Sequence, residues 1–281
     1  MNELRPDLSI IPVIRFCERL VVSVLWSIIA GSALVHAAKK LDAPCALRVG
    51  WEDWSPYIYR ENGGLAGEEY RLLEQLANAA QCELIYIDVP WVRGLTLLEQ
   101  QKIDMLYAAT RTPGREKYAR FSVPYRFEHM RLITRTVSAE MDRVKSLKAW
   151  LSQSSVQGSR NRLGVVRGSH YGDSLESTYR AFGSDQIIEV GSDDQLLEML
   201  RIGRIEGYLV EDLVAIEHVG QASAALSVYV ISEAVPEPMQ LMFGLHVPET
   251  IVHRFDAAIS ALLNEGQLGS KAPNRRADVT Q

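Results

Sequence analysis

The sequence predicts an α/β protein with two lobes, each built on a mostly parallel sheet, and two observations carry this prediction. The chain has 281 residues, and at about 150 residues per domain this length favours two domains over one. Segments with the apolar period of a strand alternate with segments that have the period of a helix, and this alternation occurs twice. Strands separated by helices pair in parallel with right-handed crossovers, so each set predicts a doubly wound sheet.

The first set of segments begins near residue 47. It comprises predicted strands at 47–51, 83–89 and 103–109 and predicted helices at 68–80 and 92–101. In the helix at 68–80, Leu72, Leu73, Leu76 and Ala80 recur every three or four residues and form one apolar face.

The second set begins near residue 163. It comprises predicted strands at 163–167, 186–190, 205–210 and 226–231 and predicted helices at 173–182 and 192–202. Ser192 opens the sequence Ser-Asp-Asp-Gln, which is typical of a capping box at the start of a helix.

Two segments are predicted to connect the lobes. The first is 131–136 with a polar stretch to about residue 162, and the second is 233–238, which contains two prolines. A strand at 241–247 and a helix at 249–263 then return to the first lobe. We therefore expect lobe 1 to comprise 38–136 and 236–268, lobe 2 to comprise 137–235, and 269–281 to be a disordered tail.

The N-terminal segment has the plan of a secretory signal. Residues 20–35 carry no charge, Arg15 and Arg19 precede them, and Val35-His36-Ala37 forms a small-residue cleavage site, so we expect removal of 1–37 and a periplasmic location. As a helix, the uncharged run spans about 24 Å, less than the roughly 30 Å hydrocarbon core of a membrane. A retained anchor is the alternative.

Composition excludes several classes of protein. There are 30 basic and 35 acidic residues without a basic block, which argues against a nucleic-acid partner. No phosphate-binding loop or dinucleotide fingerprint occurs, three cysteines do not make a disulfide framework, and the histidines lack metal-ligand spacing. We expect no cofactor and no metal.

Polar and aromatic residues follow several strands where each one ends, which is the edge of an open parallel sheet where ligands bind. The candidate ligand-binding residues are Trp54, Tyr57, Thr110, Arg115, Ser169, His170 and Glu211. A guanidinium binds a carboxylate bidentately, while an ammonium is suited to a carboxylate and an aromatic face. Our hypothesis is that Arg115 and Ser169 hold the acid end of a small zwitterion and that Glu211 and Trp54 receive its amine.

Each candidate also has a purely structural interpretation. Trp54 and Tyr57 are alternatively plugs at the top of the sheet, and Arg115 a solvated residue at a helix start. Ser169 and Glu211 are alternatively helix caps. Trp91 is expected to pack between helix and sheet. Ser169, His170 and Asp173 lie close in sequence, but a catalytic triad is assembled by the fold, so chance explains them better.

These motifs resemble the bacterial solute-binding protein family 3, the periplasmic receptors of ABC importers for polar amino acids. The strongest signal runs from Thr112-Pro113-Gly114-Arg115 to Phe121-Ser122-Val123-Pro124-Tyr125. Pro90-Trp91-x-Arg93, with cysteines matching Cys45 and Cys82, is similar to a proteobacterial subgroup.

The resemblance implies a type II periplasmic-binding-protein fold whose lobes close around a small ligand, an amino acid or related carboxylate, in a non-catalytic monomer served by an ABC permease. It places the family's carboxylate-binding arginine at Arg115 and its ammonium-binding acid at Glu211, where members usually carry Asp. Two alternatives stay open. One is a sensing protein without an importer, and the other is a lyase similar to cyclohexadienyl dehydratase with Glu211 as acid.

Cys45 and Cys82 precede the first two predicted strands, which we expect to be neighbours in the sheet. Because the periplasm is oxidising, these cysteines are expected to form a disulfide. The alternative is two buried thiols.

Overall fold

The computed structural model describes residues 45–136, 144–154, 158, 160–222, 225–266 and 268. The predicted signal peptide and the predicted tail lie outside these residues. Among the described residues, no helix combines the length and the apolar character that crossing a membrane requires.

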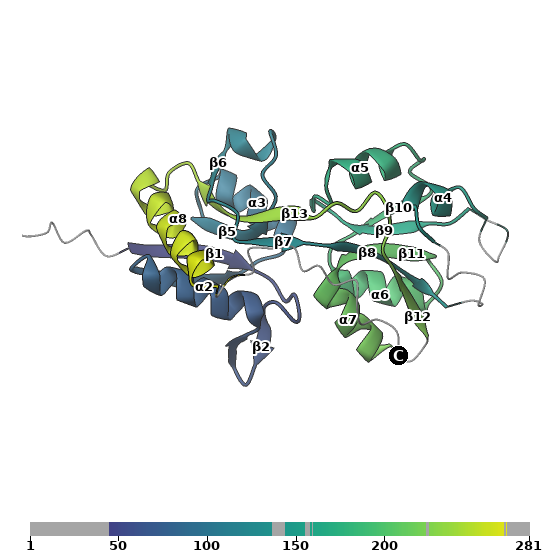
Figure 1. Cartoon of the computed structure of the whole chain (residues 1–281), viewed down its shortest axis with the longest axis horizontal. Coiled ribbons are helices and arrows are strands. Elements are labelled where there is room, and N and C mark those ends of the chain that lie inside the picture. Colours follow the sequence, from purple (N-terminus) through teal and green to yellow (C-terminus); the bar gives the residue numbers. More distant parts are fainter. Residues whose placement is uncertain are drawn as a thin grey trace, which may run out of the picture. The chain divides into compact units, whose positions relative to one another are not determined.

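The first sheet has the strand order β4-β1-β5-β13-β6, with β7 also paired to β13. β1, β4 and β5 are parallel, whereas β13 runs antiparallel to β5, β6 and β7. Helices α2 and α8 cover one face, and α3 covers the other (Figure 1). The bounds in this lobe are β1 Cys45–Trp51, α2 Glu68–Ala79, β4 Cys82–Asp88, α3 Trp91–Glu99, β5 Met105–Ala109, the 3-10 helix η2 Arg115–Lys117, β6 Ala119–Phe121, β7 Arg126–Glu128, β13 Glu237–Gly244 and α8 Glu249–Asn264.

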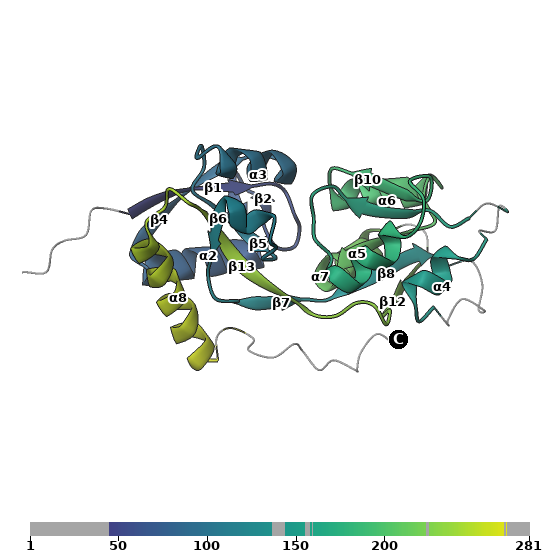
Figure 2. The same ribbon diagram turned by 90° about the horizontal axis from the view of Figure 1, so that it is seen from above.

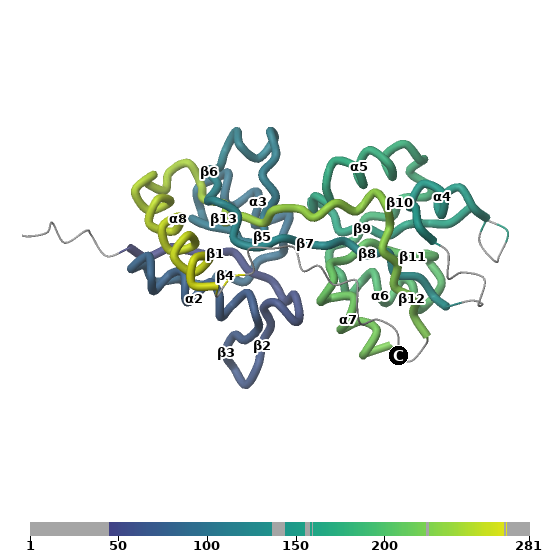
Figure 3. The backbone as a smooth tube through the Cα atoms, viewed as in Figure 1, coloured from purple at the N-terminus to yellow at the C-terminus, as the bar shows by residue number. Residues whose placement is uncertain are grey.

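The second sheet has the strand order β10-β9-β11-β8-β12. Its β9, β10 and β11 are parallel, and β8 is antiparallel to β11 and β12. The bounds in this lobe are β8 Met130–Arg135, α4 Leu147–Leu151, β9 Leu163–Val166, α5 Asp173–Arg180, β10 Ile187–Val190, α6 Asp193–Arg201, β11 Gly207–Glu211, α7 Asp212–Gln221 and β12 Leu226–Tyr229. A small hairpin of β2 Tyr59–Glu61 and β3 Gly64–Ala66 projects from the first lobe (Figure 3).

The two sheets are connected by β7 and β13, which pair with each other as they leave the first sheet (Figure 2). The segment 131–136, expected as the first connection, instead lies mostly in β8, where it pairs with β11 and β12. The connection therefore comes earlier, around Glu128. Met130, Leu132 and Ile133 are all buried, so this apolar run is a core strand and not a solvated linker.

Local sequence explains why the main helices form where they do. α8 buries Val252, Phe255 and Ile259, which recur at three- and four-residue spacing on one face. α6 begins after Ser192, whose side chain accepts from the backbone N–H of Gln195 as the capping motif predicts. These short-range signals define most element boundaries to within a few residues.

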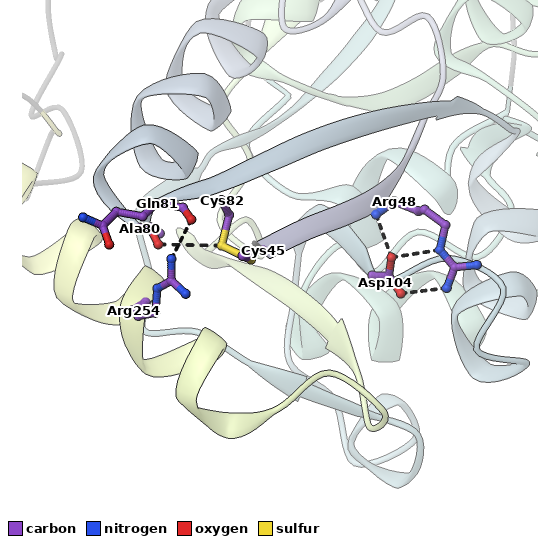
Figure 4. The surroundings of a disulfide bond; sticks show 7 residues. All are labelled: Cys45, Arg48, Ala80, Gln81, Cys82, Asp104 and Arg254. Carbon is purple, nitrogen blue, oxygen red and sulfur yellow. Dashed lines mark hydrogen bonds and ion pairs between the residues drawn. A yellow bond between two sulfur atoms is a disulfide. The ribbon is translucent and has the colours of Figure 1, made fainter. Parts of the chain in front are cut away.

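Cys45 and Cys82 stand opposite each other in the β1–β4 pairing and are joined by a disulfide, as predicted (Figure 4). On the same strand, the Arg48 guanidinium pairs with Asp104, which precedes β5, with 2.7 Å between Nη2 and Oδ1. The disulfide fixes the start of β1 against β4, and the ion pair fixes β1 against the entrance of β5.

Candidate functional site

A cavity lies where strands of both sheets reach their carboxyl ends. The volume that the centres of water molecules can occupy in it is about 130 Å³, which is roughly ten times the volume that one water requires. Side chains from both lobes line it, so its size depends on how the lobes meet. The polar and aromatic members of its lining are Glu52, Asp53, Trp54, Ser55, Trp91, Tyr107, Thr110, Arg115, Glu128, Ser169, His170, Tyr171, Ser192, Asp193, Asp194, Glu211 and His218.

All but one of the predicted site residues line this cavity. Trp54, Thr110, Arg115, Ser169, His170 and Glu211 are among them. Tyr57 is not. It is buried behind Trp54, with 4.3 Å between the stacked ring centroids. Burial raises the pKa of Tyr57, and the nearby Glu211 charge adds to the effect, so Tyr57 lies behind two lining residues.

Arg115 links the two lobes at one end of the cavity. Its Nη1 donates to the carbonyl of Thr110 at 2.8 Å, and its Nη2 donates to the carbonyl of Gly168 in the second lobe at 2.9 Å. The side chain is 8% exposed, and burial lowers the pKa of Arg115 from its ordinary value. Because a guanidinium carries five N–H donors, three remain for a ligand.

Trp91 and Gly168 complete this end. The Trp91 indole N–H donates to the same Gly168 carbonyl at 3.0 Å, and its ring lies 5.4 Å from the Arg115 guanidinium carbon. Gly168 has a φ of +76°, and a Cβ there would stand 3.1 Å from the Val92 side chain. The position therefore requires glycine. Trp91 packs against the core between α3 and the sheet, as expected, and it also lines the cavity.

Glu211 ends β11 and points into the cavity at the start of α7. Its Oε2 accepts from the backbone N–H of Leu213 at 2.7 Å, so it also caps this helix. Asp212 is not the side-chain cap and instead accepts from Arg131 at 2.8 Å. Burial raises the pKa of Glu211, against the opposing effect of the nearby Arg126 charge.

Ser169 and His170 occupy the loop after β9. α5 is capped at Gly172 and begins at Asp173, so Ser169 is not the helix cap. The His170 Nδ1 lies 2.9 Å from Glu176 and its Nε2 lies 3.5 Å from Asp173. This imidazole is thus held by carboxylates of α5 while it lines the cavity.

A first pair of carboxyl groups stands beside Trp54. Glu52 accepts from the backbone N–H of Trp91 at 3.0 Å, and Asp193 in the second lobe accepts from the Trp54 indole N–H at 3.0 Å. Burial raises the pKa of Glu52 and of Asp193 to about 7 in each case, and the Glu52 charge adds to the effect on Asp193. An indole N–H is therefore the one hydrogen-bond donor that the described side chains supply to Asp193.

A second pair lies where the chain passes between the lobes. Glu128, at the end of β7, lines the cavity with Glu211 and is 6% exposed. Arg126 stands between Glu128 and Glu69, at 2.8 Å from the former and 2.9 Å from the latter, and its guanidinium carbon lies 4.6 Å from the Tyr57 ring. Burial raises the pKa of Glu128 to about 7, with Arg126 opposing and Glu211 adding to the effect.

Acidic side chains outnumber basic ones in the lining of the cavity. Six lining residues are acidic, and Arg115 is the one arginine or lysine among the described lining residues. No three described His, Cys, Asp or Glu residues come together in an arrangement that holds a metal ion. The two carboxyl pairs thus face a space suited to organic cations.

Glu52, Trp91, Glu128 and Asp193 are four of the lining residues that sequence reasoning missed. Glu52 lies in the aromatic loop after the first predicted strand, and Asp193 lies in the capping motif. The sequence therefore marks both positions, but for roles other than lining the cavity. The Pro-Trp-x-Arg motif likewise marks Trp91. Nothing in the sequence marks Glu128, because its place in the cavity depends on the path of the connecting strand.

Comparison with known proteins identifies the family. The model of the bacterial extracellular solute-binding proteins, family 3, matches residues 47–270. The chain belongs to this family. The subgroup suggested by the Pro-Trp-x-Arg motif stays a prediction.

Individual relatives of this member of family 3 are distant. It is 25% identical over 218 residues to the arginine-binding extracellular protein ArtP of Bacillus subtilis (strain 168), covering 77% of this chain and 80% of ArtP. An ancestral arginine-binding protein solved with arginine shares 20% identity at a TM-score of 0.65, over 79% of this chain and 93% of its own. An ancestral amino-acid-binding protein, described as a precursor of cyclohexadienyl dehydratase, shares 20% identity at a TM-score of 0.63, over 79% and 90%. The predicted two-lobed periplasmic-binding-protein fold is confirmed.

Proposed function

We propose that this protein is an exported receptor that binds a basic amino acid, of which arginine is the first candidate, and delivers it to an ABC importer. One observation carries the proposal. The cavity presents two pairs of carboxyl groups, the half-buried Glu52 with Asp193 and the buried Glu128 with Glu211, and its described lining has a single arginine, Arg115. A basic amino acid carries two cationic groups and one carboxylate, which matches this set in number and sign.

Each end of the ligand has its own partner in this proposal. Arg115 takes the carboxylate with its remaining donors, Glu211 and Glu128 face the α-ammonium, and Glu52 and Asp193 face the cationic side chain beside the Trp54 ring. Residues of both lobes contribute to each end, so the ligand stabilises the closed arrangement by the difference in its affinity for the two states. The arginine-binding relatives support the same ligand class.

The test is isothermal titration calorimetry of the exported chain with L-arginine, L-citrulline and L-glutamate. Citrulline has the shape of arginine without the side-chain charge, so its binding should be weaker by about 2 to 5 kcal/mol, which is about 30-fold or more. Glutamate should not bind. Arginine at about 100 times its dissociation constant should add about 2.7 kcal/mol to the free energy of unfolding. Equal affinity for arginine and citrulline, or preference for glutamate, contradicts the proposal.

A further inference from the structure

Glu128 stands in an unusual position for a buried carboxyl group. It is 6% exposed and lines the cavity from the strand that connects the lobes. Arg126 Nη2 forms an ion pair with its Oε1 at 2.8 Å, yet among the described residues no donor makes a hydrogen bond to Oε1. A buried acceptor without a hydrogen-bond donor is costly, and more so when it is charged.

The charge around Glu128 is not balanced by the protein. Arg126 is the only guanidinium described beside it, and this one charge also serves Glu69, whose Oε2 accepts from Arg126 Nε at 2.9 Å. Glu211 adds a third carboxyl group near the same guanidinium, whose charge acts to lower the pKa of Glu211. With all three ionised, one positive charge faces three negative charges, and the balance is −2.

None of the other described groups around Glu128 supplies a positive charge. The titratable side chains that face it or adjoin it, from every element packed there, are Arg126 on β7, Glu69 on α2, Tyr57 after β1, Glu211 on β11, Tyr171 before α5 and Glu237 opposite it on β13. The tyrosine hydroxyls are neutral, because burial raises the pKa of Tyr57 and of Tyr171 above the ordinary value. The missing positive charge must come from a proton or from a ligand.

We propose that Glu128 is a specificity-determining residue that binds the α-ammonium of the ligand together with Glu211 and gives up a proton to the solvent when it does so. This inference rests on the proposed function and adds a second ammonium-binding carboxylate to it. The ligand's ammonium then supplies both the hydrogen-bond donor that Oε1 lacks and the positive charge that the cluster lacks. Free protein holds the proton, and the complex holds the cation in its place.

A dependence on pH follows with a definite sign. Since burial raises the pKa of Glu128 to about 7, the group is mostly protonated at pH values below this and must ionise before it binds a cation. Affinity should therefore rise as pH rises, by about 30-fold between pH 5.5 and 8 if one such group ionises. Binding at about pH 6.5 should release about 0.8 proton from Glu128, its protonated fraction at that pH.

The experiment is calorimetry with L-arginine and L-citrulline on the wild type and on Glu128→Gln, Glu128→Asp and Glu237→Gln. Each titration is run in PIPES and in imidazole, because the ionisation enthalpies of these buffers differ and the difference in heat reports the number of protons released. Glu128→Gln should weaken both ligands by about 10-fold to 100-fold, the value of a hydrogen bond to a charged group, and should remove about 0.8 released proton. Glu128→Asp should keep the pH dependence. Glu237→Gln is the matched control, because Glu237 lies opposite Glu128 in the strand pairing without lining the cavity, and it should behave as wild type.

Three results would contradict part or all of this proposal. If Glu128→Gln retains its melting temperature and binds both ligands as tightly as wild type, Glu128 has no part in recognition, although the proposed function stands. If only arginine is weakened, Glu128 faces the side chain and the ammonium assignment is wrong. If wild type binds arginine at no pH, the proposed function itself fails.

Discussion

Replacing Arg115 with alanine removes the guanidinium that we place against the carboxylate of the ligand. The side chain is 8% exposed, and two of its donors are already used on the carbonyls of Thr110 and Gly168. Truncating one partner of such a buried, hydrogen-bonded charge pair costs about 2 to 5 kcal/mol. The dissociation constant for L-arginine, measured by calorimetry, should therefore rise by about 30-fold to several thousand-fold.

The control for this variant is Arg204→Ala, since Arg204 is exposed between α6 and β11 and should leave the affinity unchanged. Agmatine, which is arginine without its carboxylate, gives a second comparison. It should bind Arg115→Ala and wild type alike, because the contact that the substitution removes is one that agmatine does not make. If Arg115→Ala binds arginine as tightly as Arg204→Ala does, or weakens agmatine as much as arginine, the guanidinium does not hold the carboxylate.

Two further predictions concern stability and are measured by unfolding. Replacing Cys45 and Cys82 with alanine opens a loop with a sequence separation of 37 residues. In the chain-entropy model this should lower the free energy of unfolding by about 4 kcal/mol. A denaturant midpoint equal to that of oxidised wild type would contradict this expectation. Burial raises the pKa of Asp104, but hydrogen bonds from Arg48 and His246 outweigh it and lower this pKa to about 2. Because the folded value lies below the ordinary 3.8, this stabilisation of about 2 kcal/mol is present above pH 4 and is lost as pH falls towards 2. Asp104→Asn should flatten that part of the stability curve, and an unchanged acid limb would show that the carboxylate is not the cause.

Much of the fold follows from short-range patterns in the sequence. The stripe of α8, the cap at Ser192 and the apolar run of β1 each lie within one element, so no tertiary information is needed to recognise them. The error at 131–136 has a different origin. A strand that crosses between lobes and a strand that enters the second sheet have similar composition, and only pairing with β11 and β12 distinguishes β8.

The site was less accessible to prediction for the same reason. Arg115, Trp54 and Glu211 follow strands directly, so the topology alone brings them to one edge. Tyr57 also follows a strand, but the Trp54 ring stands between it and the cavity, which only packing decides. Glu128 and Asp193 contribute through the way the lobes meet, and no residue spacing within one lobe encodes that contact.

Glu211 is also the residue on which the receptor and lyase interpretations differ, because burial raises its pKa and so favours a protonated acid. An acid alone does not make a lyase of the dehydratase kind, since prephenate-like substrates carry two carboxylates that need cationic partners. The described lining offers one arginine against six acidic side chains, so a dianion beside Glu128, Glu52 and Asp193 would have no second cationic side chain and would bind only while these carboxyl groups stay protonated. The same groups bind a dication in their ionised form and release their protons as it binds, so this complex is favoured once pH reaches about 7. The balance of charge in the cavity therefore favours the receptor, and it does so independently of any likeness to other proteins.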